Sequence, residues 1–178
     1  MSPVRPGQTL PDLRLTDTAG RTRSLAALGE QETLVIFQRH LACLPCREHL
    51  LEVLAHKDEL DVQVVAVAFA PFDVLAGYQR RLGLDDVPVL SDPERRAYRA
   101  FGFGRGSIAR VWLDPRVWRR YLSLIRRGRR PERVREDTLQ LGGDVLIDPS
   151  GRVRWVYASR GPDDRPSLAA IRAARDDA

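Results

Sequence analysis

The residues Thr33-Leu-Val-Ile-Phe37, and the Cys43-Leu-Pro-Cys46 that begins six residues after them, decide the fold. The five-residue run is β-branched, aromatic or otherwise apolar, which is typical of a central strand buried on both faces. Leu50, Leu51 and Leu54 then recur at spacings of three and four, which predicts a helix. Cys43 therefore falls where a buried strand passes into a helix.

The rest of the chain alternates strand and helix patterns. The predicted elements are a strand over 62–69, a helix over 74–82, a strand over 87–90, hairpin strands over 144–147 and 152–157, and a helix over 166–174. Asp148-Pro-Ser-Gly151 between the hairpin strands has the residues that a type I turn favours. The first half supplies parallel strands and the hairpin supplies antiparallel ones. We predict one α/β domain over 1–178, with a thioredoxin-like fold in which helices flank a central mixed sheet.

Composition indicates a globular protein, with 178 residues of which 43% are hydrophobic and 30% are charged. No apolar run approaches the ~20 residues that a membrane span requires. The N-terminus also has no apolar stretch that could serve as a signal peptide. We therefore expect a cytoplasmic protein without a membrane partner.

The two cysteines, Cys43 and Cys46, are the only ones in the chain. In a reducing compartment such a close pair points to redox cycling or metal binding rather than to a structural disulfide. The N-terminus of a helix stabilises a thiolate, and Arg39, His40 and Arg47 are expected to add positive charge nearby. Pro45, in the first helical turn, costs no hydrogen bond and stiffens the loop between the sulfurs.

These features assign roles to the two sulfurs. Cys43, expected nearer the exposed end, would be the attacking thiolate, and Cys46 would resolve the intermediate into a disulfide. Two alternatives stay open, inert core cysteines and a zinc site that adds His40 and His49. Ligands at every third position turn around a helix, so zinc would require His40 and Cys43 to lie in the loop. We expect no metal and no organic cofactor, because sulfur itself performs the chemistry.

Residues 110–138 form a predicted basic helical insertion before the hairpin. Within it, residues 116–135 hold nine arginines, which are Arg116, Arg119, Arg120, Arg126, Arg127, Arg129, Arg130, Arg133 and Arg135. Trp118, Tyr121, Leu122 and Ile125 share one helical face, which we expect to pack onto the core. Nucleic-acid binding is not expected, because no known binding module accompanies the charge. An alternative function is a thioredoxin-like binding or regulatory module whose Arg-rich segment engages an acidic partner.

Four stretches of the chain carry a family resemblance. They are Phe37–Glu48, Pro88–Pro93 with Tyr98 and Phe101-Gly102, Leu141–Asp148, and Gly151–Tyr157. With these residues the chain resembles the peroxiredoxin-like proteins of the alkyl hydroperoxide reductase and thiol-specific antioxidant superfamily, in particular the selenoprotein L-like and peroxiredoxin-like 2 branch. The resemblance implies a thioredoxin fold and thiol redox chemistry. It also implies a peroxide or protein disulfide as substrate, and a thioredoxin-type or low-molecular-weight thiol as reductant.

Two positions depart from that superfamily's pattern. In its Pro-x-x-x-Thr/Ser-x-x-Cys motif, counted back from Cys43, the hydroxyl position holds His40 and the proline position holds Ile36. Counted back from Cys46, the same positions hold Cys43 and Arg39, so neither register matches. The resemblance leaves open which cysteine would take the peroxidatic part. Thioredoxins carry a cis-proline facing the cysteines before the equivalent of strand 144–147, where this chain has Gly142-Gly143. Gly143 would let a peroxide or a substrate backbone approach closely. The alternative is a tight turn that requires a positive φ.

Overall fold

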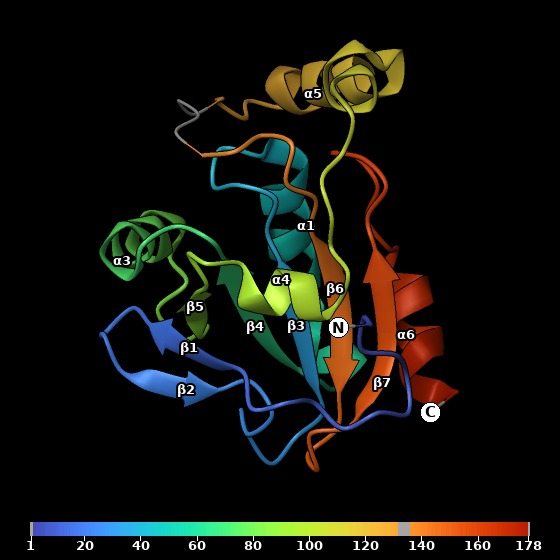
Figure 1. Ribbon diagram of the computed structural model, residues 1–178. Helices are drawn as coiled ribbons and strands as arrows, with labels where there is room; N and C mark the ends of the chain where they lie inside the picture. The colour runs from blue at the N-terminus through green and yellow to red at the C-terminus, as the bar shows by residue number, and fades with distance from the viewer. Residues whose placement is uncertain (1, 132–135, 178) are drawn as a thin grey trace.

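The computed structural model describes residues 2–131 and 136–177, and its centre is a seven-stranded mixed sheet (Figure 1). The strands are β1 (Arg14–Asp17), β2 (Thr22–Ser24), β3 (Thr33–Phe37), β4 (Gln63–Ala68), β5 (Val89–Ser91), β6 (Gly143–Ile147) and β7 (Val153–Ala158). They lie in the order β2-β1-β5-β4-β3-β6-β7 across the sheet.

The strand β3 lies in the interior of the sheet, as its apolar run predicts. All five of its residues are buried. It pairs in parallel with β4, which pairs in parallel with β5, and it pairs antiparallel with β6 on its other side. The strands β6 and β7 form the predicted antiparallel hairpin. The mixed sheet predicted from the order of elements is therefore confirmed.

The described residues form seven helices, some of which cover the two faces of this sheet. They are α1 (Leu44–Ala55), α2 (Lys57–Leu60), α3 (Phe72–Leu82), α4 (Arg96–Ala100), the π-helix η1 (Ala109–Leu113), α5 (Pro115–Arg126) and α6 (Leu168–Asp176). Side chains alternate along β3, so Leu34 and Ile36 pack with one core cluster, whereas Val35 and Phe37 pack with the other. The first cluster includes residues of α1, α3 and α6, and the second includes α4 and the N-terminal segment.

The segment with η1 and α5 lies at one end of the molecule, beyond the N-terminus of α1 (Figure 1). The helix α5 begins at Pro115, after Asp114, whose carboxylate accepts a hydrogen bond from the backbone N–H of Arg116. Val117 and Leu124 are its buried residues. Arg133 and Arg135, which belong to the predicted basic segment, lie outside the described residues.

The expectation that the aromatic face of α5 packs onto the core is wrong. Trp118, Leu122 and Ile125 are 56%, 46% and 43% exposed. Only Val117 and Leu124, at one edge of the apolar arc, are buried, where α5 contacts α1 and η1. None of the helices in the described residues is long and apolar enough to span a membrane.

Candidate active site

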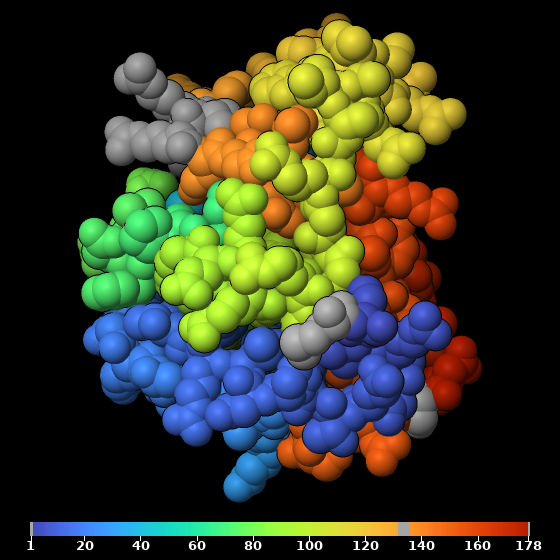
Figure 2. Space-filling view, in the orientation of Figure 1, coloured from blue at the N-terminus to red at the C-terminus, as the bar shows by residue number. Residues whose placement is uncertain are grey.

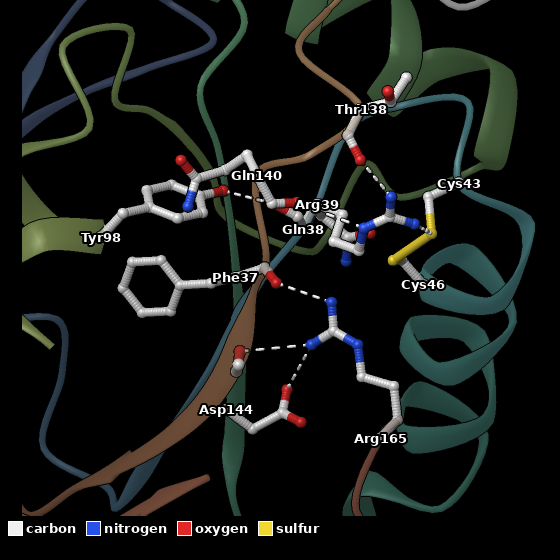
Figure 3. Close-up of a disulfide and its surroundings, with 11 residues drawn as sticks. Phe37, Gln38, Arg39, Cys43, Cys46, Tyr98, Thr138, Gln140, Asp144 and Arg165 are labelled. Atoms are coloured by element: carbon white, nitrogen blue, oxygen red, sulfur yellow. Dashed lines mark hydrogen bonds and ion pairs between the residues drawn. A yellow bond between two sulfur atoms is a disulfide. The ribbon is translucent and has the colours of Figure 1, made fainter. Parts of the chain in front are cut away.

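Cys43 and Cys46 form a disulfide at the start of α1 (Figure 3). Cys43 is the N-cap residue of the helix, and the Cα atoms of the two cysteines are 5.4 Å apart. Pro45 lies in the first turn, as predicted. Both cysteines are buried, with Cys43 1% and Cys46 0% exposed. The expectation that Cys43 lies nearer an exposed end is therefore wrong, because other segments cover the N-terminus of α1.

Arg39 is buried beside Cys43 and links it to the segment before β6. Its Nη1 donates to Cys43 Sγ at 3.6 Å, its Nε donates to the carbonyl of Gln140 at 3.2 Å, and its Nη2 donates to the carbonyl of Thr138. Burial lowers the pKa of Arg39 from its ordinary value, but a guanidinium keeps its charge in proteins. The structure thus places a cation on the Cys43 sulfur, as the sequence predicted.

The carbonyl groups that hold Arg39 are themselves fixed by hydrogen bonds. The Gln140 side chain donates to the carbonyls of Phe103 and Leu141, at 2.9 Å each. The Asp137 carboxylate accepts from Arg95 Nη1 at 2.9 Å and from the backbone N–H of Leu139 at 3.0 Å. The position of Arg39 is therefore set by residues far from it in the sequence.

His40 adds no positive charge to the site, contrary to expectation. It is 4% exposed, and burial, with the neighbouring charge of Arg39 as a second cause, lowers its pKa to about 3. The imidazole is therefore neutral at physiological pH. Its Nδ1 has no hydrogen-bond partner among the described residues.

A cavity of about 180 Å³ lies against Arg39 and His40. Its other walls are mostly apolar, and Trp112, Trp118 and Tyr121 contribute to them. Tyr121 also lies close enough to the Arg39 guanidinium for that charge to act on the pKa of its hydroxyl, which burial raises. The segment that contains η1 and α5 thus covers Arg39 and His40 beside the disulfide.

The interpretation of Gly143 as an open approach to the cysteines is wrong. Gly143 is the first residue of β6 and is buried. A side chain there would meet the Tyr157 carbonyl and the Phe103 ring. The alternative of a turn with positive φ is also wrong, because neither Gly142 nor Gly143 has one. Glycine is required at this position by the close approach of β7 and an aromatic ring.

A buried polar cluster near the disulfide was missed by sequence reasoning. Asp144, which is 0% exposed, has one carboxylate oxygen 3.1 Å from His49 Nε2 and the other 3.4 Å from Arg165 Nη1. Arg165 Nη2 also donates to the carbonyl of Phe37 at 2.8 Å (Figure 3). The only sequence signal was an aspartate inside the apolar run of β6.

The cluster also bears on the zinc alternative. His49 is paired with Asp144, whereas His40 lines the cavity together with Arg39. Within residues 2–131 and 136–177, no group of three or more His, Cys, Asp or Glu side chains could hold a metal ion.

Comparison with known proteins places this site in a family. Residues 50–161 match the family model described as AhpC/TSA antioxidant enzyme. The chain belongs to this family. The match begins at Leu50, just after the cysteine pair, and includes the segment that holds Arg39. Family membership supports an oxidoreductase that works through thiol chemistry.

Similar proteins extend the match across the cysteines. Peroxiredoxin-like 2C of Mus musculus is 25% identical over 90% of this chain and 76% of its own length. A peroxiredoxin-like protein from Aquifex aeolicus has the same fold, with a TM-score of 0.69 at 12% identity over 99% of this chain and 89% of its own. A thiol peroxidase from Chromobacterium violaceum has a TM-score of 0.66 at 14% identity, over 99% and 88% of the two chains.

Proposed function

We propose that this AhpC/TSA-family protein is a thiol-dependent peroxidase that cycles Cys43 and Cys46 between a dithiol and a disulfide. The observation that carries the proposal is the buried Arg39 guanidinium, which donates to Cys43 Sγ at the N-terminus of α1. In the reduced protein this cation and the helix N-terminus would stabilise a thiolate on Cys43. Cys46 lies one turn further along the helix, within disulfide distance.

The cycle has three balanced steps. The Cys43 thiolate attacks one oxygen of the peroxide ROOH, the O–O bond breaks, and RO⁻ takes a proton and leaves as ROH. Cys43 is now a sulfenic acid. The Cys46 thiol attacks its sulfur, which forms the disulfide and releases water. Two thiols of an external reductant then restore both cysteines and leave as a disulfide.

The neighbouring residues have distinct roles in this proposal. Arg39 is a positioning residue that holds Cys43 as a thiolate. His40, neutral in the folded protein, lines the cavity from which a peroxide would approach. Pro45 limits the backbone freedom of the turn between the two sulfurs. Gly143 has a packing role and no part in the chemistry.

Burial of the cysteines favours a peroxide over a protein disulfide as the oxidising substrate. Cys43 is 1% exposed, so a bulky disulfide could reach its sulfur only after the covering segment moves. A hydroperoxide presents two small oxygen atoms and needs less space. We further propose that the reductant is a low-molecular-weight thiol, or a thioredoxin-type thiol that reaches the disulfide after the covering segment moves. The protein would work in a reducing compartment such as the cytoplasm.

Trapping of the intermediate tests the proposal. Reduced wild-type protein, Cys43→Ser and Cys46→Ser are each mixed with one equivalent of hydrogen peroxide, and free thiols and dimedone adducts are measured. Wild type should lose two thiols and form no lasting adduct. Cys46→Ser should accumulate a dimedone adduct on Cys43, because no resolving thiol is present. Cys43→Ser should keep its remaining thiol over the same period.

Each of the other outcomes contradicts a defined part of the proposal. An adduct on Cys46 in Cys43→Ser, and none on Cys43 in Cys46→Ser, would reverse the two roles. Thiol loss in wild type that is as slow as the oxidation of free cysteine would contradict the proposed enzymatic function. The second candidate, a redox-inert binding module, would then be favoured.

A further inference from the structure

The end of the molecule formed by η1 and α5 carries an apolar surface that the core does not cover. We call it the apolar ridge, and its exposed side chains are Trp112, Leu113, Trp118, Leu122 and Ile125. On α5 they recur at i, i+4 and i+7 and so form one stripe. Leu113 lines the same groove as the α5 residues. Scattered apolar side chains are ordinary on a protein surface, but a contiguous patch marks an interaction site.

The ridge offers little polar surface to a partner. The indole Nε1 of Trp118 donates to the carbonyl of Trp112 at 2.7 Å, so its one polar group is already satisfied within the protein. The segment that carries the ridge forms one end of the molecule, drawn in yellow in Figure 2. A helix in this position can lie flat on an extended surface.

Arginines border the ridge without compensating acids. Residues 115–131 contain no Asp or Glu. At 100° per residue, Arg119 and Arg126 follow the stripe on its solvent side, and Arg116, Arg120 and Arg127 lie further around the helix. These five side chains are exposed and have no ion-pair partner within the described part of the chain. The combined surface is apolar at its centre and cationic along its open border, apart from the half-buried Asp114 that caps α5.

We propose that η1 and α5 form an interfacial segment that docks the protein on an anionic lipid surface. An amphipathic helix with Trp and Leu on one face and arginines on the other has the composition of helices that lie in the headgroup region. A protein partner of acidic character is less well matched, because protein interfaces fix their register with charges of both signs and a polar rim. The expectation of no membrane partner rests on the lack of an apolar run long enough to span a bilayer, which a helix lying on the surface does not need.

The proposal goes beyond the thiol chemistry, because docking requires neither cysteine. Docking would also orient the candidate active site relative to the lipid, because Trp118 belongs both to the ridge and to the wall of the cavity beside Arg39. Docking would bring that cavity to the lipid surface.

Vesicle flotation of the full chain tests the proposal. At low salt we expect the protein to float with vesicles of phosphatidylcholine and phosphatidylglycerol (3:1), to stay behind with pure phosphatidylcholine, and to be released by 0.5 M NaCl. The double variant Leu122→Ser/Ile125→Ser should lower the partition coefficient at least tenfold. Arg119→Gln/Arg126→Gln should lower it by a similar factor, since each arginine near an anionic surface contributes about fivefold.

Matched variants separate the ridge from general surface effects. Phe72→Ser/Val74→Ser removes two comparably exposed apolar side chains from α3, and Arg5→Gln/Arg160→Gln removes two exposed arginines elsewhere. Both should float as wild type does, and so should Cys43→Ser, whatever the fate of the peroxidase proposal. Absence of flotation with anionic vesicles, or equal loss in ridge and control variants, would overturn the proposal. Retention on immobilised polyglutamate without flotation would favour an acidic protein partner instead.

Discussion

Arg39 is the residue on which the proposed chemistry depends most, because one guanidinium is shared between a sulfur and two backbone carbonyls. Each of these acceptors would lose its donor if the side chain were removed. A charge-assisted hydrogen bond contributes about 1.5–3 kcal/mol. In the proposed cycle the residue would therefore stabilise both the reduced sulfur and the fold around it.

A conservative substitution separates these two effects. Arg39→Lys keeps a cation but removes the guanidinium group whose Nη1 reaches Cys43 Sγ. Alkylation of reduced Cys43 by iodoacetamide at pH 7 should therefore slow by a factor of about ten or more. Arg165→Lys is the matched control, since it changes a second arginine, with a side chain only 6% exposed, that donates to Phe37 and pairs with Asp144. It should leave the alkylation rate nearly unchanged. Equal slowing in both variants would mean that packing alone is responsible.

The neutral His40 predicts a pH dependence of stability. Its pKa is about 3 in the folded protein, below the ordinary value of 6.5. The stability it contributes is complete above pH 6.5 and is lost as the pH falls from 6.5 toward 3. From pH 7 to pH 5 this loss amounts to about 2 kcal/mol.

Urea unfolding at the two pH values measures that loss. His40→Gln should flatten the dependence, because the titrating group is gone. His56→Gln, which changes a less buried histidine, should keep the wild-type slope. An unchanged slope in His40→Gln would show that the imidazole is not held neutral.

At the scale of elements, residues close together on α5 differ strongly in how far they are buried. Leu124 is 1% exposed, whereas Leu122, two residues earlier, is 46% exposed. Leu124→Ala should therefore lower the free energy of unfolding by about 2–5 kcal/mol, and Leu122→Ala should change it by less than about 0.5 kcal/mol. Thermal or urea denaturation of the two variants measures the difference. Similar losses in both would mean that the ridge is covered in the folded protein.

The start of β6 allows a comparable test. Gly143→Ala places a methyl group against the Tyr157 carbonyl and the Phe103 ring, so we expect a loss of about 1–3 kcal/mol from overpacking. Gly104→Ala has open space around the added carbon and should be near neutral. If Gly143→Ala proved harmless to stability but slowed peroxide reduction, the packing role would be contradicted.

The regular elements were largely predictable because their signals are local. The apolar run of β3, the turn sequence between β6 and β7, and Gly83 after α3 each specify structure within a few residues. The position of α5 was also predictable from its periodicity. Which part of its apolar arc is buried was not, because that depends on its contacts with α1 and η1.

At the scale of the whole molecule, the candidate site joins residues from distant parts of the chain. The cysteine pair and Arg39 could be predicted, since they are neighbours in sequence. The carbonyls of Thr138 and Gln140, and the pairing of His49 with Asp144, could not, because only the β3–β6 pairing brings them together. The neutral state of His40 was missed for the same reason, since burial by the covering segment decides it.

The proposed cycle requires that Cys43 and Cys46 of the same chain form a disulfide with each other when peroxide is reduced. Its most direct test is a stoichiometric titration of the fully reduced protein with peroxide, followed by mass spectrometry under non-reducing conditions. We expect one equivalent of peroxide to consume both thiols and to leave a monomer with a single Cys43–Cys46 disulfide. Thiols that persist after excess peroxide, or a disulfide formed only between two chains, would contradict it.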